Sequence, residues 1–145
     1  MPPSSFVVDS SVVVKWFVKD EPDDSPAQRI LQIFRKGDSQ FIIPDLLFYE
    51  VGNVFLKKWP RDLEKIQRGF LALWRLPWFL IPLRQSLLAR SLELAAQYQL
   101  TFYDALFVAT AERSEAAFIT ADEKLLKRIK FFPFAHSLSS FEGDD

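Results

Sequence analysis

The chain has 145 residues, of which 49% are hydrophobic and 15% aromatic, and its formal net charge is −1. This length and composition predict a single domain over residues 1–145 with a sizeable core, and they exclude an intrinsically disordered chain. The lack of cysteine excludes disulfides and thiolate chemistry, and the single histidine, His136, excludes a multi-histidine metal centre.

Short apolar runs alternate with helical patterns along the whole chain. The apolar runs, typical of buried parallel strands, predict strands at residues 6–9, 41–43, 79–81, 117–120 and 134–138. The segments between them predict helices at about 10–17, 26–36, 46–58, 62–76, 85–98, 101–114 and 122–128. This order predicts an α/β fold with a central, mostly parallel sheet of four or five strands and helices on both faces.

Several boundaries carry typical capping or breaking residues. A charged, proline-bearing loop over 20–26 leads to a helix that begins near Ser25 and ends at Gly37. Asp45 is a plausible N-cap for the helix after the second strand. Residues 141–145 are expected to form a frayed tail.

The sequence gives no indication of a membrane or secreted protein. No basic segment followed by an apolar run opens the chain, so no signal peptide is expected. The longest apolar stretch, residues 76–83, is too short to span a bilayer and contains two prolines. A cytoplasmic location is therefore the expectation.

Four carboxylates occupy positions where an α/β chain places its chemistry. Asp9 ends the first strand and Asp122 follows the fourth, and the carboxyl ends of parallel strands meet at a shared crevice. Glu50 and Asp104 lie in otherwise apolar helical segments, where an isolated acid is costly to bury. Four acids at one crevice would repel one another unless a divalent cation neutralised them, which points to Mg²⁺ or Mn²⁺.

Each acid also has a purely structural interpretation. Asp9 and Asp122 can cap the helices that follow them. Asp104 lies three residues after Thr101, as in a capping box, and Glu50 can occupy a solvated helix edge. Capping alone, however, gives no reason for the four acids to converge.

Each acid lies within a short motif, and the four motifs follow one another along the chain. They are Val8-Asp9-Ser10-Ser11, Glu50 with Asn53 three residues later, Tyr103-Asp104-Ala105, and Thr120-Ala121-Asp122. Together, and in this order, they resemble the motifs of PIN-domain nucleases, and among these the VapC-type toxins of bacterial and archaeal toxin–antitoxin pairs. The resemblance runs from Val7 to about Leu138.

The resemblance implies a three-layer α/β/α PIN-like fold and hydrolysis of RNA phosphodiester bonds. Asp9, Glu50 and Asp104 would be the inner ligands of Mg²⁺ or Mn²⁺, and Asp122 would bind directly or through water. All four acids would thus be catalytic residues as well as metal ligands. An antitoxin protein would be the partner of such an enzyme.

Residues beside the acids are candidates for orienting them. Ser10, Ser11 and Thr120 adjoin the acids in sequence, and Asn53 could hold the Glu50 carboxylate. Helix capping is the alternative for the hydroxyl residues, and solvation is the alternative for Asn53. His136 lies far from the motifs and is interpreted as structural.

RNA binding requires positive charge around an acidic site, because phosphate contacts dominate affinity. The candidates are Lys15 in the first helix and Lys124, Lys127 and Arg128 in the last predicted helix. Solvated faces of amphipathic helices are the alternative interpretation for each of them.

The segment between Leu63 and Trp78 carries more apolar positions than one core requires. They include Phe70, Leu73 and Trp74, which suggests an interface for a homodimer mate or for an antitoxin.

Other function classes fit less well. A haloacid-dehalogenase-like phosphatase requires a second Asp where this chain has Ser11, and a receiver domain requires paired acids after the first strand. Two alternatives remain open: a non-catalytic PIN-like scaffold that binds RNA or protein, and a PIN nuclease that acts in RNA processing without an antitoxin.

Overall fold

A five-stranded parallel sheet forms the centre of the computed structural model, which describes residues 5–19 and 25–141. The strands are β1 (Ser5–Val8), β2 (Gln40–Ile43), β3 (Phe79–Leu80), β4 (Ala117–Thr120) and β5 (Ala135–Ser137). The helices are α1 (Ser10–Phe17), α2 (Pro26–Lys36), α3 (Leu46–Lys58), α4 (Leu63–Trp74), α5 (Gln85–Tyr98), α6 (Phe102–Ser114) and α7 (Glu123–Arg128), with a 3₁₀ helix η1 (Leu138–Phe141). The predicted α/β fold is confirmed, while most of the predicted loop at 20–26 lies outside the described residues.

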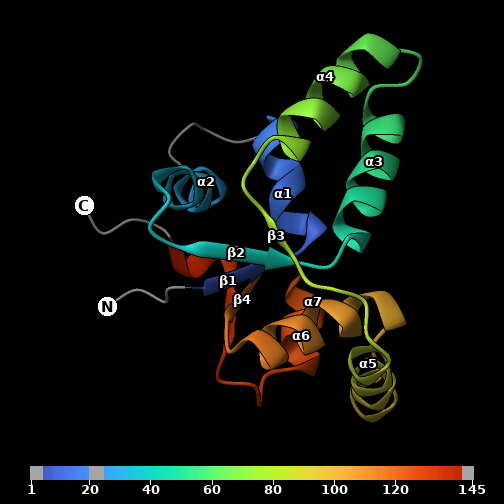
Figure 1. The fold of residues 1–145 in the computed structure, drawn as a ribbon. Helices are drawn as coiled ribbons and strands as arrows, with labels where there is room; N and C mark the ends of the chain where they lie inside the picture. The colour runs from blue at the N-terminus through green and yellow to red at the C-terminus, as the bar shows by residue number, and fades with distance from the viewer. Residues whose placement is uncertain (1–4, 20–24, 142–145) are drawn as a thin grey trace.

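The sheet has the strand order β3-β2-β1-β4-β5, and every neighbouring pair is parallel. Helices α1 to α4 lie on one side of the sheet, and α5 and α6 lie on the other (Figure 1). The chain extends the sheet from β1 in one direction through β2 and β3, and then returns to place β4 on the other side of β1. In open α/β sheets such a reversal creates a crevice at the carboxyl ends of the two strands, here β1 and β4.

Aromatic side chains hold the helical layer above β2. The ring centroids of Phe34 on α2 and Phe41 on β2 lie 4.2 Å apart in a stacked arrangement, and Trp78 meets Phe34 edge-on at 4.6 Å. Trp16 on α1 is buried, and its indole N–H donates to the carbonyl of Ala27 at 2.8 Å. These contacts position α1, which begins just after the carboxyl end of β1.

Most helix ends follow the predicted capping pattern. Ser10 and Ser11 are exceptions: they do not cap α1 but lie in its first turn, because Asp9 is the N-cap. The Ser25 hydroxyl accepts the N–H of Gln28, and Gly37 ends α2 in the left-handed conformation. Asp45 is the N-cap residue of α3, as predicted, but its backbone is helical (φ −63°, ψ −15°) and its side chain makes no capping bond. A side chain at this position reaches the free N–H groups of the first turn when its backbone is extended, and the backbone of Asp45 is not. The Asp45 carboxylate instead accepts the hydroxyl of Tyr49 at 3.2 Å.

The C-terminal segment supplies β5, the edge strand opposite β3. His136 lies in β5 and pairs in register with Ile119. Phe141, expected at the start of the tail, contacts Phe6 edge-on at 6.4 Å, and residues 142–145 lie outside the described part of the chain. Among the described residues, no helix has the length and apolar character needed to cross a bilayer.

Replacement of Gly37 by alanine should lower the free energy of unfolding by about 1–2 kcal/mol, as measured in urea. The φ angle of 82° strains any residue that carries a Cβ, while no atom lies within 4 Å of the added methyl group to crowd it. Gly37→Asn should lose less, because asparagine tolerates the left-handed region. Equal losses for the two variants would contradict backbone strain as the cause.

Candidate active site

Asp9 occupies the junction between β1 and α1, and only 6% of its surface is exposed. Its extended backbone makes it the N-cap of α1, where Oδ1 accepts the N–H of Ser11 at 3.1 Å. Oδ2 accepts the hydroxyl of Thr120 at 2.6 Å, from the end of β4. One oxygen of this carboxylate therefore caps α1, and the other links the end of β1 to the end of β4 through Thr120.

Two hydroxyl groups fix the position of the Asp9 carboxylate. Ser11 Oγ donates to Asp9 Oδ1 and accepts the N–H of Ala121 at 2.9 Å. Thr120 Oγ1 donates to Asp9 Oδ2 and accepts the N–H of Asp122 at 3.1 Å. Each hydroxyl oxygen accepts a backbone N–H, so its single proton remains available to donate to the carboxylate.

The Asp9 carboxylate is costly to ionise in this position. Burial is the main cause that raises the pKa of Asp9 to about 6. The hydrogen bonds from Ser11 and Thr120 oppose this rise, whereas the negative charges of Asp104 and Glu50 add to it. Added positive charge at this point would therefore stabilise the ionised form.

Glu50 lies half-buried on α3, on the same side of the sheet as α1. Its Oε1 accepts the hydroxyl of Ser10 at 3.1 Å, which links α3 to the first residue of α1. Burial raises the pKa of Glu50 most, the bond from Ser10 lowers it, and the charge of Asp104 raises it.

Asp104 approaches from the opposite layer, in the first turn of α6. The N–H of Asp104 donates to the hydroxyl of Thr101, which caps the helix as predicted. Burial raises the pKa of Asp104, and the charge of Asp122 raises it further. A hydrogen bond from Thr101 and the positive charge of Arg128 act in the opposite direction.

Asp122 combines a capping role with proximity to the other acids. Its Oδ1 accepts the N–H of Leu125 at 3.1 Å, as expected of the N-cap of α7. Its charge is one of the causes that raise the pKa of Asp104. As for Asp9, capping and membership of the acidic group are compatible roles.

The four acids thus share one end of the sheet. Their charges act on one another in four pairs: Asp9 with Glu50, Asp9 with Asp104, Glu50 with Asp104, and Asp104 with Asp122. Within residues 5–19 and 25–141, however, no three acidic or histidine side chains are close enough to hold one metal ion. The donor set fits a hard cation in its chemistry, because such ions prefer carboxylate oxygens, although the side chains lie farther apart than direct coordination requires.

The remaining candidates divide into those beside the acids and those apart from them. Asn53 is exposed on α3, and Glu50 is bonded by Ser10 instead. Arg128 donates to the carbonyl of Gln99 and lies near enough to Asp104 to lower its pKa. Lys124 and Lys127 are exposed on α7, and Lys15 is partly buried on α1.

Sequence reasoning missed one contact of the acidic group. Thr101 was considered only as a helix cap, but its hydroxyl also lowers the pKa of Asp104. The capping pattern of Thr101 and Asp104, three residues apart in the sequence, could have indicated this contact.

Comparison with known proteins places this arrangement in a family. The sequence pattern of the PIN domain matches residues 6–131, which is most of the chain. The chain belongs to the PIN domain family. A search of curated proteins found no significant match to this PIN-domain protein.

Solved structures with the same fold include several proteins of toxin–antitoxin systems. VapBC2 from Rickettsia felis, crystallised with a promoter DNA fragment, gives a TM-score of 0.68 at 18% identity and covers 92% of this chain and 98% of that one. A toxin–antitoxin complex from Klebsiella pneumoniae gives 0.66 at 23% identity, covering 91% and 96%. VapC20 of Mycobacterium tuberculosis, described as a toxin that cleaves the sarcin–ricin loop, gives 0.65 at 10% identity, covering 84% and 93%. These similarities establish the PIN fold of the present chain.

Replacement of Asp9 by asparagine should stabilise the fold at neutral pH by up to about 3 kcal/mol, as measured by urea unfolding in EDTA. The native state holds the Asp9 proton more tightly (pKa about 6) than an unfolded chain does (3.8), so ionisation removes stability as the pH rises between these values. Asparagine does not ionise, and the difference between variant and parent should therefore vanish below about pH 4 and be complete above about pH 6.

Asp38, which is exposed in the turn before β2, provides the control. Asp38→Asn should change the stability by less than about 0.5 kcal/mol at any pH in this range. An Asp9→Asn variant that is less stable than the parent at neutral pH would show that the carboxylate contributes more as a hydrogen-bond acceptor than its burial costs.

Proposed function

We propose that this PIN-domain protein is a metal-dependent endoribonuclease and the toxin of a type II toxin–antitoxin pair. One observation carries the proposal: four acids, two that follow strands and one from each helical layer, act on one another at the carboxyl ends of β1 and β4. Membership of the PIN family and the fold shared with toxin–antitoxin proteins support it. A pure scaffold has no physical need for carboxylates that oppose one another's ionisation.

In this proposal Asp9, Glu50 and Asp104 would be the inner ligands of Mg²⁺ or Mn²⁺, which requires their side chains to move closer together than they lie here, and Asp122 would bind directly or through water. When bound, such an ion supplies positive charge that activates water and stabilises the phosphate during in-line displacement. The protein supplies the orientation of the ligands. Ser11 and Thr120 fix both oxygens of Asp9, and Ser10 directs Glu50 toward the same end of the sheet.

Positive side chains beside the acids would bind the RNA backbone. Arg128 is the best placed, since its charge already acts on Asp104. Lys124 and Lys127 lie exposed on the same short helix, which follows Asp122 directly. Lys15 on α1 lies six residues, or between one and two helical turns, beyond Asp9. A ribonuclease of this kind would bind single strands more weakly as the salt concentration rises.

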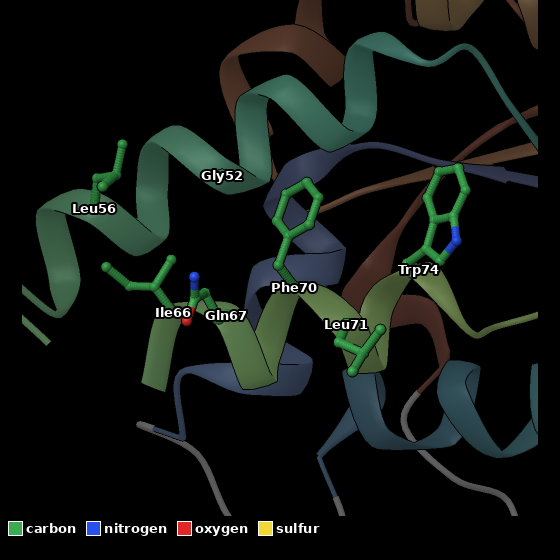
Figure 2. Close-up of a pocket in the computed structure, with 7 residues that line it drawn as sticks. All are labelled: Gly52, Leu56, Ile66, Gln67, Phe70, Leu71 and Trp74. Atoms are coloured by element: carbon green, nitrogen blue, oxygen red, sulfur yellow. The ribbon is translucent and has the colours of Figure 1, made fainter. Parts of the chain in front are cut away.

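An apolar groove between α3 and α4 supports the proposal of a protein partner. Figure 2 shows Phe70 of α4 directed at Gly52 of α3, with Leu56 and Trp74 at the two ends of the groove. The groove has a volume of about 490 Å³, and Ile66, Gln67 and Leu71 complete its lining. Trp74 is 60% exposed and Leu71 46%, while Leu73 is fully buried, so the predicted apolar surplus lies on one face of α4. An apolar segment of an antitoxin, or a second copy of the chain, would bury this face.

Asp104→Asn should abolish Mg²⁺-dependent cleavage of single-stranded RNA and leave the melting temperature the same or higher. The substitution keeps the shape of the side chain but removes a charge that the cation requires. A loss of at least about 1,000-fold in cleavage rate is expected from the loss of one ligand, measured with a fluorescently labelled RNA.

Asp38→Asn is the matched control, because it removes an exposed carboxylate near the amino ends of the strands and should cleave like the parent. Cleavage by the parent that persists unchanged in EDTA would contradict the metal-dependent mechanism. If the purified parent cuts no RNA with either Mg²⁺ or Mn²⁺, the scaffold interpretation is favoured.

Leu71→Glu should weaken binding of the partner at the groove by at least about 100-fold, because it places a charge in an apolar interface. We expect growth arrest on overexpression of the parent, relief when the product of the adjacent gene is co-expressed, and loss of this relief for Leu71→Glu. Leu92→Glu is the control, since Leu92 is 57% exposed on α5, in the opposite helical layer. Equal relief for both variants would exclude the groove as the binding surface.

A further inference from the structure

A second cavity lies between α1 and α3, beside the acidic group. It has a volume of about 320 Å³, and its lining includes Ser10 and Ser11. The hydroxyl groups of these two residues bond the carboxylates of Glu50 and Asp9. The cavity therefore adjoins the site through Ser10 and Ser11, although none of the four acids lines it.

The rest of the lining is apolar with two cationic side chains. Val14 contributes from α1, Val18 from the C-cap position just after it, and Val54 from α3. Lys15 and Lys58 also line the cavity, one from each helix. A volume near the lower limit of small-molecule sites, roughly 300 Å³, admits a single nucleotide rather than a helical segment of a protein.

We propose that this cavity binds one nucleotide of single-stranded RNA, the one next to the phosphodiester bond that is cut. The inference rests on the proposed ribonuclease function and names a substrate subsite for it. The valine side chains contact the faces of the base, and the ammonium groups of Lys58 and Lys15 pair with the flanking phosphates. The acids themselves repel phosphate, so the backbone needs cationic partners close to the point of cleavage.

The form of the cavity favours single-stranded RNA over other occupants. Only an unpaired base can leave its stack and enter a side pocket, because a duplex keeps its bases stacked and paired. Apolar walls contact any base face without reading its edges, so little base specificity arises here. A protein helix fits the larger and almost wholly apolar α3–α4 groove better than this small cavity with its two lysines.

The position of Lys58 on α3 links the cavity to Glu50. Glu50, Val54 and Lys58 follow one another at intervals of four residues and therefore share one face of the helix. An RNA strand that places a phosphate at the acids can thus continue along this face toward Lys58.

Direct binding can be tested by methyl NMR in EDTA, with adenosine 5′-monophosphate and uridine 5′-monophosphate as probes. Both should shift the methyl signals of Val14, Val18 and Val54, while the methyl signals of Val51, fully buried in the core, should stay unchanged. Ribose 5-phosphate, which lacks a base, should not shift the three valines. Valine signals that remain unmoved by the nucleotides, or that move equally with ribose 5-phosphate, would overturn the inference.

Cleavage kinetics provide the second test, with Lys57→Gln as the matched control on the same helix. Lys58→Gln should raise the KM for single-stranded RNA about tenfold, keep kcat within about twofold, and reduce the salt slope of binding by about 0.7. Lys57 does not line the cavity, and Lys57→Gln should change KM by less than about twofold. Equal effects of the two substitutions would indicate diffuse electrostatics and overturn the subsite.

The two tests separate this inference from the function on which it rests. Lack of RNA cleavage by the parent contradicts the proposed ribonuclease, whereas the NMR titration does not depend on cleavage. Nucleotide binding at the valines in a protein that cuts no RNA would support a nucleotide site in this cavity and favour the scaffold, but it would contradict the placement of that site beside a cleaved bond.

Discussion

The rest of the site depends on the hydrogen bonds that hold the buried Asp9 carboxylate between the ends of β1 and β4. An isolated carboxylate in this position would be strongly destabilising. Here Ser11 and Thr120 each donate to it, and the backbone of the turn after β4 satisfies both hydroxyls in return. The two central strands are thus joined through a polar network at the point where the strand order reverses, and the geometry of the crevice follows from that connection.

Charge at this end of the sheet is left less compensated than charge elsewhere in the fold. On the far helical layer, Arg90 pairs with Glu112 at 2.7 Å and with Glu93 at 3.0 Å. By contrast, the hydrogen bonds that lower the pKa values of Asp9 and Glu50 come from hydroxyl groups. A fold optimised only for stability would replace such acids, which is consistent with the cation-binding role proposed for them.

The sequence predicted the elements well, because strands and helices here follow local patterns of apolar residues. The limits of α5 and the Gly37 end of α2 emerged as predicted, since both depend on residues within one or two turns. Asp45 is the N-cap residue of α3 but makes no side-chain capping bond, because that bond depends on a backbone angle that the local pattern does not determine. The convergence of the acids could be anticipated from strand ends, but which hydroxyl bonds which carboxylate could not, since those partners lie up to 111 positions apart. The cavity beside Val54 was invisible for the same reason: it forms only where two helices, separate in sequence, lie side by side.

Helix α3 brings three different environments together, one on each of its faces. Val51 and Phe55 are fully buried and anchor it to the core, Glu50 faces the acids, and Gly52 lines the apolar groove. A methyl group on Gly52 would lie 3.2 Å from the Phe70 ring, so the ring would have to shift by a few tenths of an ångström to admit it. A protein bound in the groove would contact the helix that carries Glu50 without covering the acids. Because the buried face resists displacement of the helix, a partner that inhibits the proposed cleavage would have to extend beyond the groove to the carboxyl ends of the strands.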